Sequence, residues 1–150
     1  MLEVGQVAPD FTLPDQHGEN LTFSSLQGKT VVLFFYPKAD TPGCTIEACN
    51  FRDESGNFDG ANVVILGISP DSSKDQKLFA DKFNLPYRLM ADADHKVAEA
   101  YGVWGEKSMY GKKYMGVSRT TFVIGPDGKL THIFNKVKPE GHAKEVLEAI

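Results

Sequence analysis

Cysteine is scarce in this chain, which contains only Cys44 and Cys49, together with four scattered histidines, among 150 residues. A tetrahedral zinc site would have to recruit carboxylates at no recognisable spacing. The pair Asp92 and Asp94 lacks the glycine and distal glutamate of an EF-hand, so we expect it to cap a helix instead. The sequence therefore predicts no metal ion.

Long apolar runs are also absent. The longest, at 31–36, is far too short to cross a bilayer, and the N-terminus lacks a basic region followed by an apolar one. We therefore expect a protein of the reducing cytoplasm that does not bind membranes. In such a compartment a cysteine pair in a mid-sized protein is more often catalytic than a permanent cross-link.

Neither sign of charge dominates the chain. The formal net charge is −4, acidic and basic residues are mixed, and no lysine and arginine cluster contains interleaved aromatic residues. This pattern argues against a nucleic-acid partner. No proline-, serine- or glycine-rich tract could serve as a linker, so we expect residues 1–150 to form a single domain.

What the chain does contain is an alternation of strand and helix signals. Apolar runs at 30–36 and 62–69 are typical of strands buried on both faces. Shorter strand signals lie at 11–13, 21–23, 88–90, 120–124 and 130–134. Helix signals follow Thr41 and cover 72–83, 95–101 and 141–150, whereas 105–116 carries no clear signal.

This order of elements predicts an α/β fold. The strands 30–36 and 62–69, with a helix between them, form a βαβ unit whose strands are parallel. A closing hairpin and helix complete a thioredoxin-like fold with an N-terminal β-hairpin extension. Ligands of such sheets bind beyond the carboxyl ends of the strands, where the turn 37–43 must lie.

Cys44 directly follows that turn. Thr41 is a good N-cap and Pro42 suits the first helical position, which puts Cys44 in the first turn of a helix. The helix dipole stabilises a thiolate there by roughly 0.3–1 kcal/mol, and by about 2 kcal/mol where the site is partly buried, which lowers a cysteine pKa of about 8.5 by about one unit. We therefore expect Cys44 to be a nucleophile.

A fully reactive thiolate also needs a cation, and arginine is best suited because it stays charged. The chain has three arginines: Arg52, Arg88 and Arg119. Arg52 lies two turns along the cysteine helix, and Arg88 starts a predicted strand. Arg119 precedes the strand 120–124, which can run beside the first βαβ strands and carry it to Cys44.

Cys49 lies five residues after Cys44. Within one helix this spacing gives a Cα separation of about 8.7 Å, beyond the roughly 7 Å limit for a disulfide. A catalytic pair therefore requires the first turns of the helix to unwind during turnover. The alternative is that Cys49 is a small buried residue without a chemical role.

Five segments together resemble the peroxiredoxins, and most closely the bacterioferritin comigratory protein, or peroxiredoxin Q, subfamily. They are GQVAPDFTLPDQHG, FFYPKADTPGCTIEACNFRD, VVILGISPDS, ADADHKVAEAYGVWGEK and SRTTFVIGPDGK. The second segment is the most specific, because it joins the family's PxxxTxxC signature to a second cysteine five residues later.

The resemblance implies a thiol-dependent peroxidase that reduces hydrogen peroxide and organic hydroperoxides without a cofactor. It makes Cys44 the peroxidatic cysteine, Thr41 the threonine whose hydroxyl bonds the thiolate and the peroxide, and Pro37 the proline that shields the sulfur. Arg119 matches the family's arginine. Cys49 matches a resolving cysteine, which forms an intramolecular disulfide that thioredoxin or a similar dithiol protein reduces. The resemblance also favours a monomer.

Two other functions fit the same residues. A thioredoxin-like disulfide oxidoreductase would also use two thiols, but its CxxC spacing is absent. A redox sensor or holdase would use oxidation to melt the cysteine helix and expose apolar surface to a partner. Catalytic turnover of peroxide distinguishes the peroxidase from both.

Overall fold

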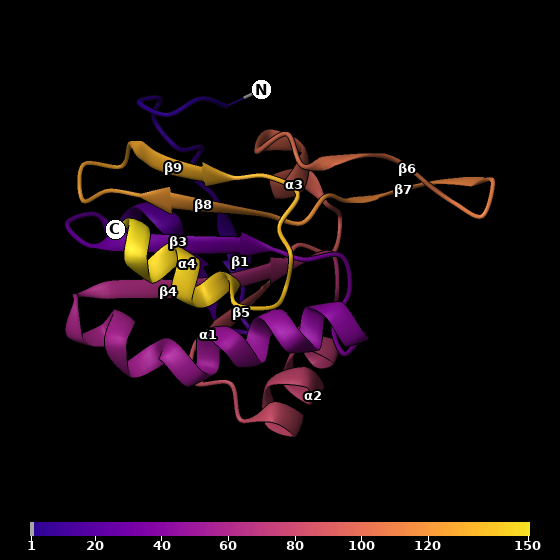
Figure 1. Ribbon diagram of the computed structural model, residues 1–150, viewed down its shortest axis with the longest axis horizontal. Helices are drawn as coiled ribbons and strands as arrows, with labels where there is room; N and C mark the ends of the chain where they lie inside the picture. The colour runs from indigo at the N-terminus through magenta and orange to yellow at the C-terminus, as the bar shows by residue number, and fades with distance from the viewer. Residues whose placement is uncertain (1) are drawn as a thin grey trace.

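The computed structural model describes residues 2–150 and centres on a five-stranded sheet with the order β5-β4-β3-β8-β9 (Figure 1). Its strands are β3 (Thr30–Phe35), β4 (Val63–Ser69), β5 (Arg88–Ala91), β8 (Thr120–Ile124) and β9 (Leu130–Phe134). The helices are α1 (Pro42–Gly60), α2 (Ser73–Phe83), α3 (Lys96–Ala100) and α4 (His142–Ala149), and a 3₁₀ turn covers Phe23–Leu26. None of these helices is long and apolar enough to cross a membrane.

The strand directions confirm the predicted thioredoxin-like fold. β3, β4 and β5 are parallel, whereas β8 pairs antiparallel with β3 and β9 pairs antiparallel with β8. The N-terminal extension is also confirmed, as β1 (Thr12–Pro14) pairs antiparallel with β2 (Asn20–Thr22). Both of its strands lie one residue from the predicted positions.

The central strand β3 shows why its sequence is apolar without interruption. Side chains alternate between the two faces of a strand. Alternate residues from Val31 to Phe35 pack in a cluster with α3 and the N-terminal segment. Those from Val32 to Tyr36 pack in a second cluster with α1, α2 and α4. Both faces of β3 are therefore covered by apolar side chains, which explains the uninterrupted apolar run at 31–36.

Side chains accept backbone N–H groups at the starts of α2 and α3. Ser72 is the N-cap of α2 and accepts a hydrogen bond from the Asp75 N–H at 3.2 Å. The buried carboxylate of Asp92 accepts the N–H groups of Val97 at 3.2 Å and Ala98 at 2.9 Å. These bonds confirm that Asp92 supports a helix start. Separately, no three His, Cys, Asp or Glu side chains among residues 2–150 are grouped so that they could hold a metal ion.

The segment 105–116, which the sequence left unassigned, is a second hairpin. It pairs β6 (Trp104–Met109) with β7 (Lys112–Val117) and projects from the body of the molecule (Figure 1). Tyr110 and Gly111 at its tip have φ of 51° and 78°. Positive φ at both central residues is the pattern of a type I′ turn, whose usual sequence is Asn-Gly. Tyr-Gly therefore gave no recognisable signal.

Candidate active site

Cys44 lies at the third position of α1, beyond the carboxyl end of β3. Thr41 occupies the N-cap with an extended backbone, and Pro42 is the first helical residue, as predicted. The Cys44 side chain is buried, with the residue 1% exposed. Its sulfur therefore lies at the positive end of a 19-residue helix, where partial burial strengthens the interaction of a thiolate with the helix dipole.

Arg119 is the cation that reaches this sulfur. It directly precedes β8, whose first residue Thr120 pairs with Phe35 at the end of β3. This pairing brings Arg119 to the carboxyl end of β3, close to the start of α1. Arg119 Nη2 donates a hydrogen bond to Cys44 Sγ at 3.3 Å. Burial opposes the charge on Arg119, but the negative charges of Glu47 and Cys44 outweigh it and raise the Arg119 pKa.

Gly43 makes room for this guanidinium. A Cβ at Gly43 would lie 3.2 Å from Arg119 Nη2 and 3.6 Å from Pro139 Cγ. A larger residue would therefore press on the same nitrogen that bonds the sulfur. The small residue before Cys44 is explained by this close approach.

Glu47 completes the arrangement and was not identified from the sequence. It lies three residues after Cys44, which places both side chains on one face of the helix. Its Oε1 accepts from Arg119 Nη1 at 2.8 Å, whereas Oε2 is buried without a partner among residues 2–150. Burial raises the Glu47 pKa to about 7, although the charge of Arg119 acts to lower it. Glu47 therefore holds the arginine that contacts the sulfur.

The turn before α1 is anchored to the neighbouring strand. The Asp71 carboxylate accepts from the Ala39 N–H at 2.8 Å and from the Ser69 hydroxyl at 2.6 Å, where β4 ends. Thr41 and Pro37 both lie in this turn and are half-buried. The Thr41 hydroxyl donates to the Lys38 carbonyl at 2.8 Å and caps no N–H of α1. Its role at the N-cap is therefore one of backbone geometry.

Cys49 lies in the same continuous helix, and both cysteines are free thiols. Unlike Cys44, it is half-buried rather than fully enclosed. A negative charge on Cys49 would raise the pKa values of both Tyr87 and Arg52, which places these two side chains near it. With α1 intact, the spacing of the two thiols keeps them beyond disulfide range.

Two hydrogen bonds hold α1 in place at the residues on either side of Cys49. The buried Tyr87 hydroxyl donates to the Ala48 carbonyl at 2.6 Å, directly before Cys49. The Asn50 side chain accepts from the Gly141 N–H at 3.0 Å, which ties α1 to the start of α4. Unwinding the first turns of α1 must work against such contacts.

The other two arginines are engaged elsewhere. Arg52 donates to the Phe83 carbonyl at 2.9 Å and to Asp53 at 3.0 Å. Arg88 pairs with Asp15 at 3.5 Å. Of the three candidates, only Arg119 contacts Cys44.

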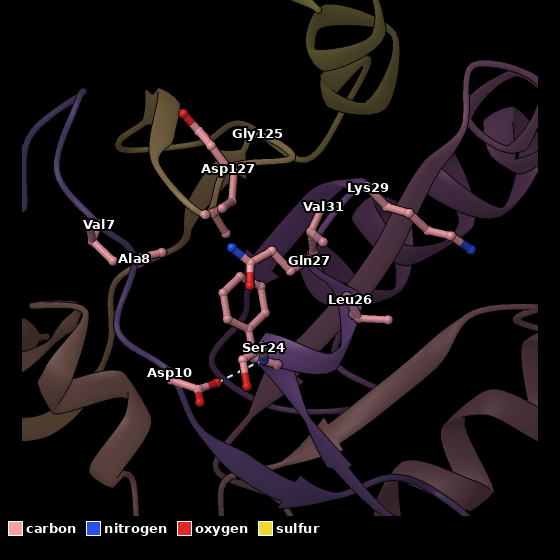
Figure 2. Close-up of a pocket in the computed structure, with 13 residues that line it drawn as sticks. Val7, Ala8, Asp10, Ser24, Leu26, Gln27, Lys29, Val31, Gly125 and Asp127 are labelled. Carbon is pink, nitrogen blue, oxygen red and sulfur yellow. Dashed lines mark hydrogen bonds between the residues drawn. The ribbon is translucent and has the colours of Figure 1, made fainter.

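A pocket at the other end of the sheet is separate from this site. Figure 2 shows its lining, which includes Val31 near the start of β3 and Gly125 directly after β8. Asp10 accepts the Ser24 N–H there at 2.8 Å. Cys44 lies at the opposite ends of β3 and β8, and neither Cys44 nor Arg119 lines this pocket.

A thioredoxin-like sheet that presents a buried, arginine-bonded thiol at a helix N-terminus defines a thiol-based redox enzyme. Comparison with known proteins agrees. The AhpC/TSA family matches residues 4–133. A bcp protein of Coxiella burnetii is 52% identical over 146 residues, which cover 97% of each chain. Peroxiredoxin Bcp of Bacillus subtilis is 47% identical over 149 residues, which cover 99% of this chain and 95% of that one.

Solved structures lead to the same family. A Xylella fastidiosa peroxiredoxin Q has a TM-score of 0.94 at 32% identity, covering 99% of this chain and 95% of that one. A Xanthomonas campestris peroxiredoxin Q has a TM-score of 0.91 at 38% identity with the same coverage. The chain belongs to the AhpC/TSA family, and within it to the peroxiredoxins of the Bcp and peroxiredoxin Q type. It is therefore a thiol-dependent peroxidase, as the sequence resemblance implied.

Proposed function

We propose that Cys44 is the peroxidatic cysteine and that Arg119, Thr41 and Pro37 form its catalytic environment. The observation that carries this assignment is the 3.3 Å hydrogen bond from Arg119 Nη2 to the Cys44 sulfur. A guanidinium and a helix N-terminus both favour the thiolate over the thiol. Pro37, half-buried in the turn before α1, limits access of water to the sulfur.

In the first half-reaction the Cys44 thiolate attacks the terminal oxygen of a hydroperoxide. The O–O bond breaks, the sulfur becomes a sulfenic acid, and the leaving oxygen takes up a proton to depart as an alcohol, or as water from hydrogen peroxide. Negative charge develops on both oxygens, and fixed donors stabilise it. Arg119 supplies such donors, and the Thr41 hydroxyl is a rotor that can turn from the Lys38 carbonyl toward the substrate.

In the second half-reaction the Cys49 thiolate attacks the Cys44 sulfenic sulfur. A disulfide forms and the hydroxyl leaves as water after protonation. Because the intact helix holds the thiols too far apart, the first turns of α1 must open before this step. A dithiol protein such as thioredoxin then returns two electrons and two protons. Rapid resolution also protects Cys44 from irreversible oxidation.

One Xanthomonas campestris bacterioferritin comigratory protein structure concerns alkyl peroxide reduction, with 38% identity to this chain. We propose hydrogen peroxide and organic hydroperoxides as the substrates here as well. We further propose that the protein acts as a monomer in the cytoplasm and needs neither membrane, nucleic acid nor cofactor.

The test begins with reduced protein and one equivalent of hydrogen peroxide. Mass spectrometry should detect a Cys44–Cys49 disulfide, and thioredoxin with its reductase should then support continuous turnover. Cys44→Ser should abolish both. Cys49→Ser should retain one reaction with peroxide but lose thioredoxin-coupled turnover. A Cys49→Ser variant that cycles normally with thioredoxin would show that Cys49 is not the resolving residue.

A further inference from the structure

Lys107 lies on the β6–β7 hairpin, but its side chain is folded back over the neighbouring strand. A Cβ at Gly116 would lie 3.3 Å from Lys107 Cδ, so the lysine stem crosses the hairpin where β7 has no side chain. The ring of Tyr114, the cross-strand partner of Lys107, lies 3.4 Å from the same point. Glycine at position 116 therefore opens the path that the lysine stem takes.

This path ends beside the segment that carries Arg119. Lys107 Nζ donates a hydrogen bond to the Val117 carbonyl at 2.9 Å, two residues before Arg119 in the chain. Burial lowers the Lys107 pKa, the positive charge of Arg119 lowers it further, and the negative charge of Cys44 acts in the opposite direction. The hydrogen bond therefore fixes the Lys107 ammonium at the end of β7, directly before the segment that carries Arg119 to Cys44.

The balance of charges around Arg119 favours a second cation near the thiol site. Arg119 is shared between the Cys44 sulfur and the buried Glu47 carboxylate. When Glu47 and Cys44 are both ionised, two negative charges face one positive charge. Buried charges are stable only when they are paired. A second cation nearby adds to the stabilisation of the thiolate, even though it is also repelled by Arg119.

We propose that Lys107 is this second cation, a positioning residue that the β6–β7 hairpin brings to the active site and that stabilises the Cys44 thiolate together with Arg119. The inference rests on the proposed role of Cys44. It assigns a function to a hairpin that otherwise only projects from the fold. The placement of that hairpin then sets part of the electrostatic potential at the sulfur.

The test measures the Cys44 pKa in a Cys49→Ser background, where the ultraviolet absorbance of the thiolate reports one sulfur only. Lys107→Met keeps an apolar stem but removes the charge. We expect the Cys44 pKa to rise by roughly 0.2–0.7 unit, the shift that a partly exposed charge pair produces. The shift should shrink at high salt, which screens partly exposed charges.

The same hairpin offers a matched control. Lys113 pairs with Ser108 in the register, on the face of the hairpin opposite to Lys107, and its Nζ lies 3.6 Å from Glu106. Lys113→Met makes the same change in net charge but should leave the Cys44 pKa unchanged. Lys107→Arg should restore the parent value. Equal titration curves for Lys107→Met and Lys113→Met would overturn the proposal.

Damage to the hairpin can be recognised separately. Trp104 is the only tryptophan of the chain, lies at the base of β6 and stacks on His95 with a centroid distance of 3.9 Å. Its fluorescence should be the same in all variants. A pKa shift that appears equally in Lys107→Arg, or only with altered Trp104 emission, would show that charge is not the cause.

Peroxide kinetics separate this proposal from the underlying function. At a pH below the Cys44 pKa, the single-turnover rate should fall in Lys107→Met because less Cys44 is in the thiolate form. The fall should be the same for hydrogen peroxide and cumene hydroperoxide, since both substrates are neutral and do not interact with the lysine charge. A loss confined to hydroperoxides that carry a carboxylate would place Lys107 on the substrate instead and overturn the proposal. If the parent protein consumes no peroxide, the function itself fails, whatever the Cys44 pKa does.

Discussion

Arg119 Nη2 lies 3.3 Å from Cys44 Sγ, although 75 residues separate the two in the chain. The same guanidinium bonds Glu47 at 2.8 Å from its other terminal nitrogen. One arginine therefore joins the Cys44 sulfur to a buried carboxylate one helical turn away.

The first prediction concerns the Arg119 contact itself. Arg119→Met should raise the Cys44 pKa by about 1–3 units, because a nearby opposite charge lowers a pKa by that amount. Thiolate absorbance against pH, in a Cys49→Ser background, measures the change. Arg119→Lys keeps the charge without the paired donors and should recover only part of the shift. An unchanged titration in Arg119→Met would remove Arg119 from the site.

The second prediction concerns the support that Glu47 gives to Arg119. Glu47→Ala removes a charge-assisted hydrogen bond worth about 1.5–3 kcal/mol, so the rate with hydrogen peroxide should fall roughly ten- to a hundredfold. Glu47→Gln keeps an acceptor for Arg119 and should lose less. Stopped-flow measurement of the first half-reaction gives both rates. Equal rates in the parent and Glu47→Ala would show that Arg119 is held without Glu47.

A third prediction follows from the Glu47 pKa, which burial raises from 4.5 to about 7. Between these values the folded state binds more protons than the unfolded state, so Glu47 contributes stability below about pH 4.5 that is lost as the pH rises through about 7. Urea denaturation of the reduced protein should therefore show a smaller fall in unfolding free energy from pH 5 to pH 8 in Glu47→Gln than in the parent.

The parent must be compared with Glu47→Gln because His142 changes the unfolding free energy with pH in the opposite direction. Burial lowers the His142 pKa, so the contribution of His142 to the unfolding free energy increases as the pH rises. Both proteins retain His142, and the difference between their pH profiles isolates Glu47. Identical profiles would mean that Glu47 does not titrate in this range in the folded protein.

The fourth prediction concerns the unwinding of α1. Tyr87→Phe deletes the hydrogen bond to the Ala48 carbonyl, worth about 0.5–1.5 kcal/mol, and should accelerate disulfide formation after peroxide attack about two- to tenfold. Quenched-flow trapping of the disulfide measures the step. The same change should protect Cys44 from overoxidation at high peroxide, because resolution then competes better.

Tyr101→Phe is the matched control for this variant. The Tyr101 hydroxyl also donates to a backbone carbonyl at 2.6 Å, but to that of Pro9, away from α1. It should destabilise the protein to a similar extent without changing the rate of disulfide formation. Equal rates for the two variants would show that Tyr87 does not restrain the helix.

Most elements of the fold were predictable because their signals are local. Continuous apolar runs gave the central strands, and Thr41 and Asp92 were recognisable as residues at helix starts. The hairpin of β6 and β7 was missed because both of its strands are largely exposed and lack an apolar period. Its positive-φ turn uses Tyr110 and Gly111 instead of the usual Asn-Gly pair.

The features of the site also separate into those set by local sequence and those set by contacts between distant segments. The sequence by itself determined that Cys44 begins a helix and that Cys49 cannot reach it while that helix is intact, because capping, proline geometry and helical rise are properties of adjacent residues. Only the tertiary structure decided that Arg119 bonds both Cys44 and Glu47, and that the Lys107 side chain folds back onto the segment before Arg119. Their approach depends on strand pairing, burial and the space left by two glycines, which are relations between segments that lie far apart in the chain.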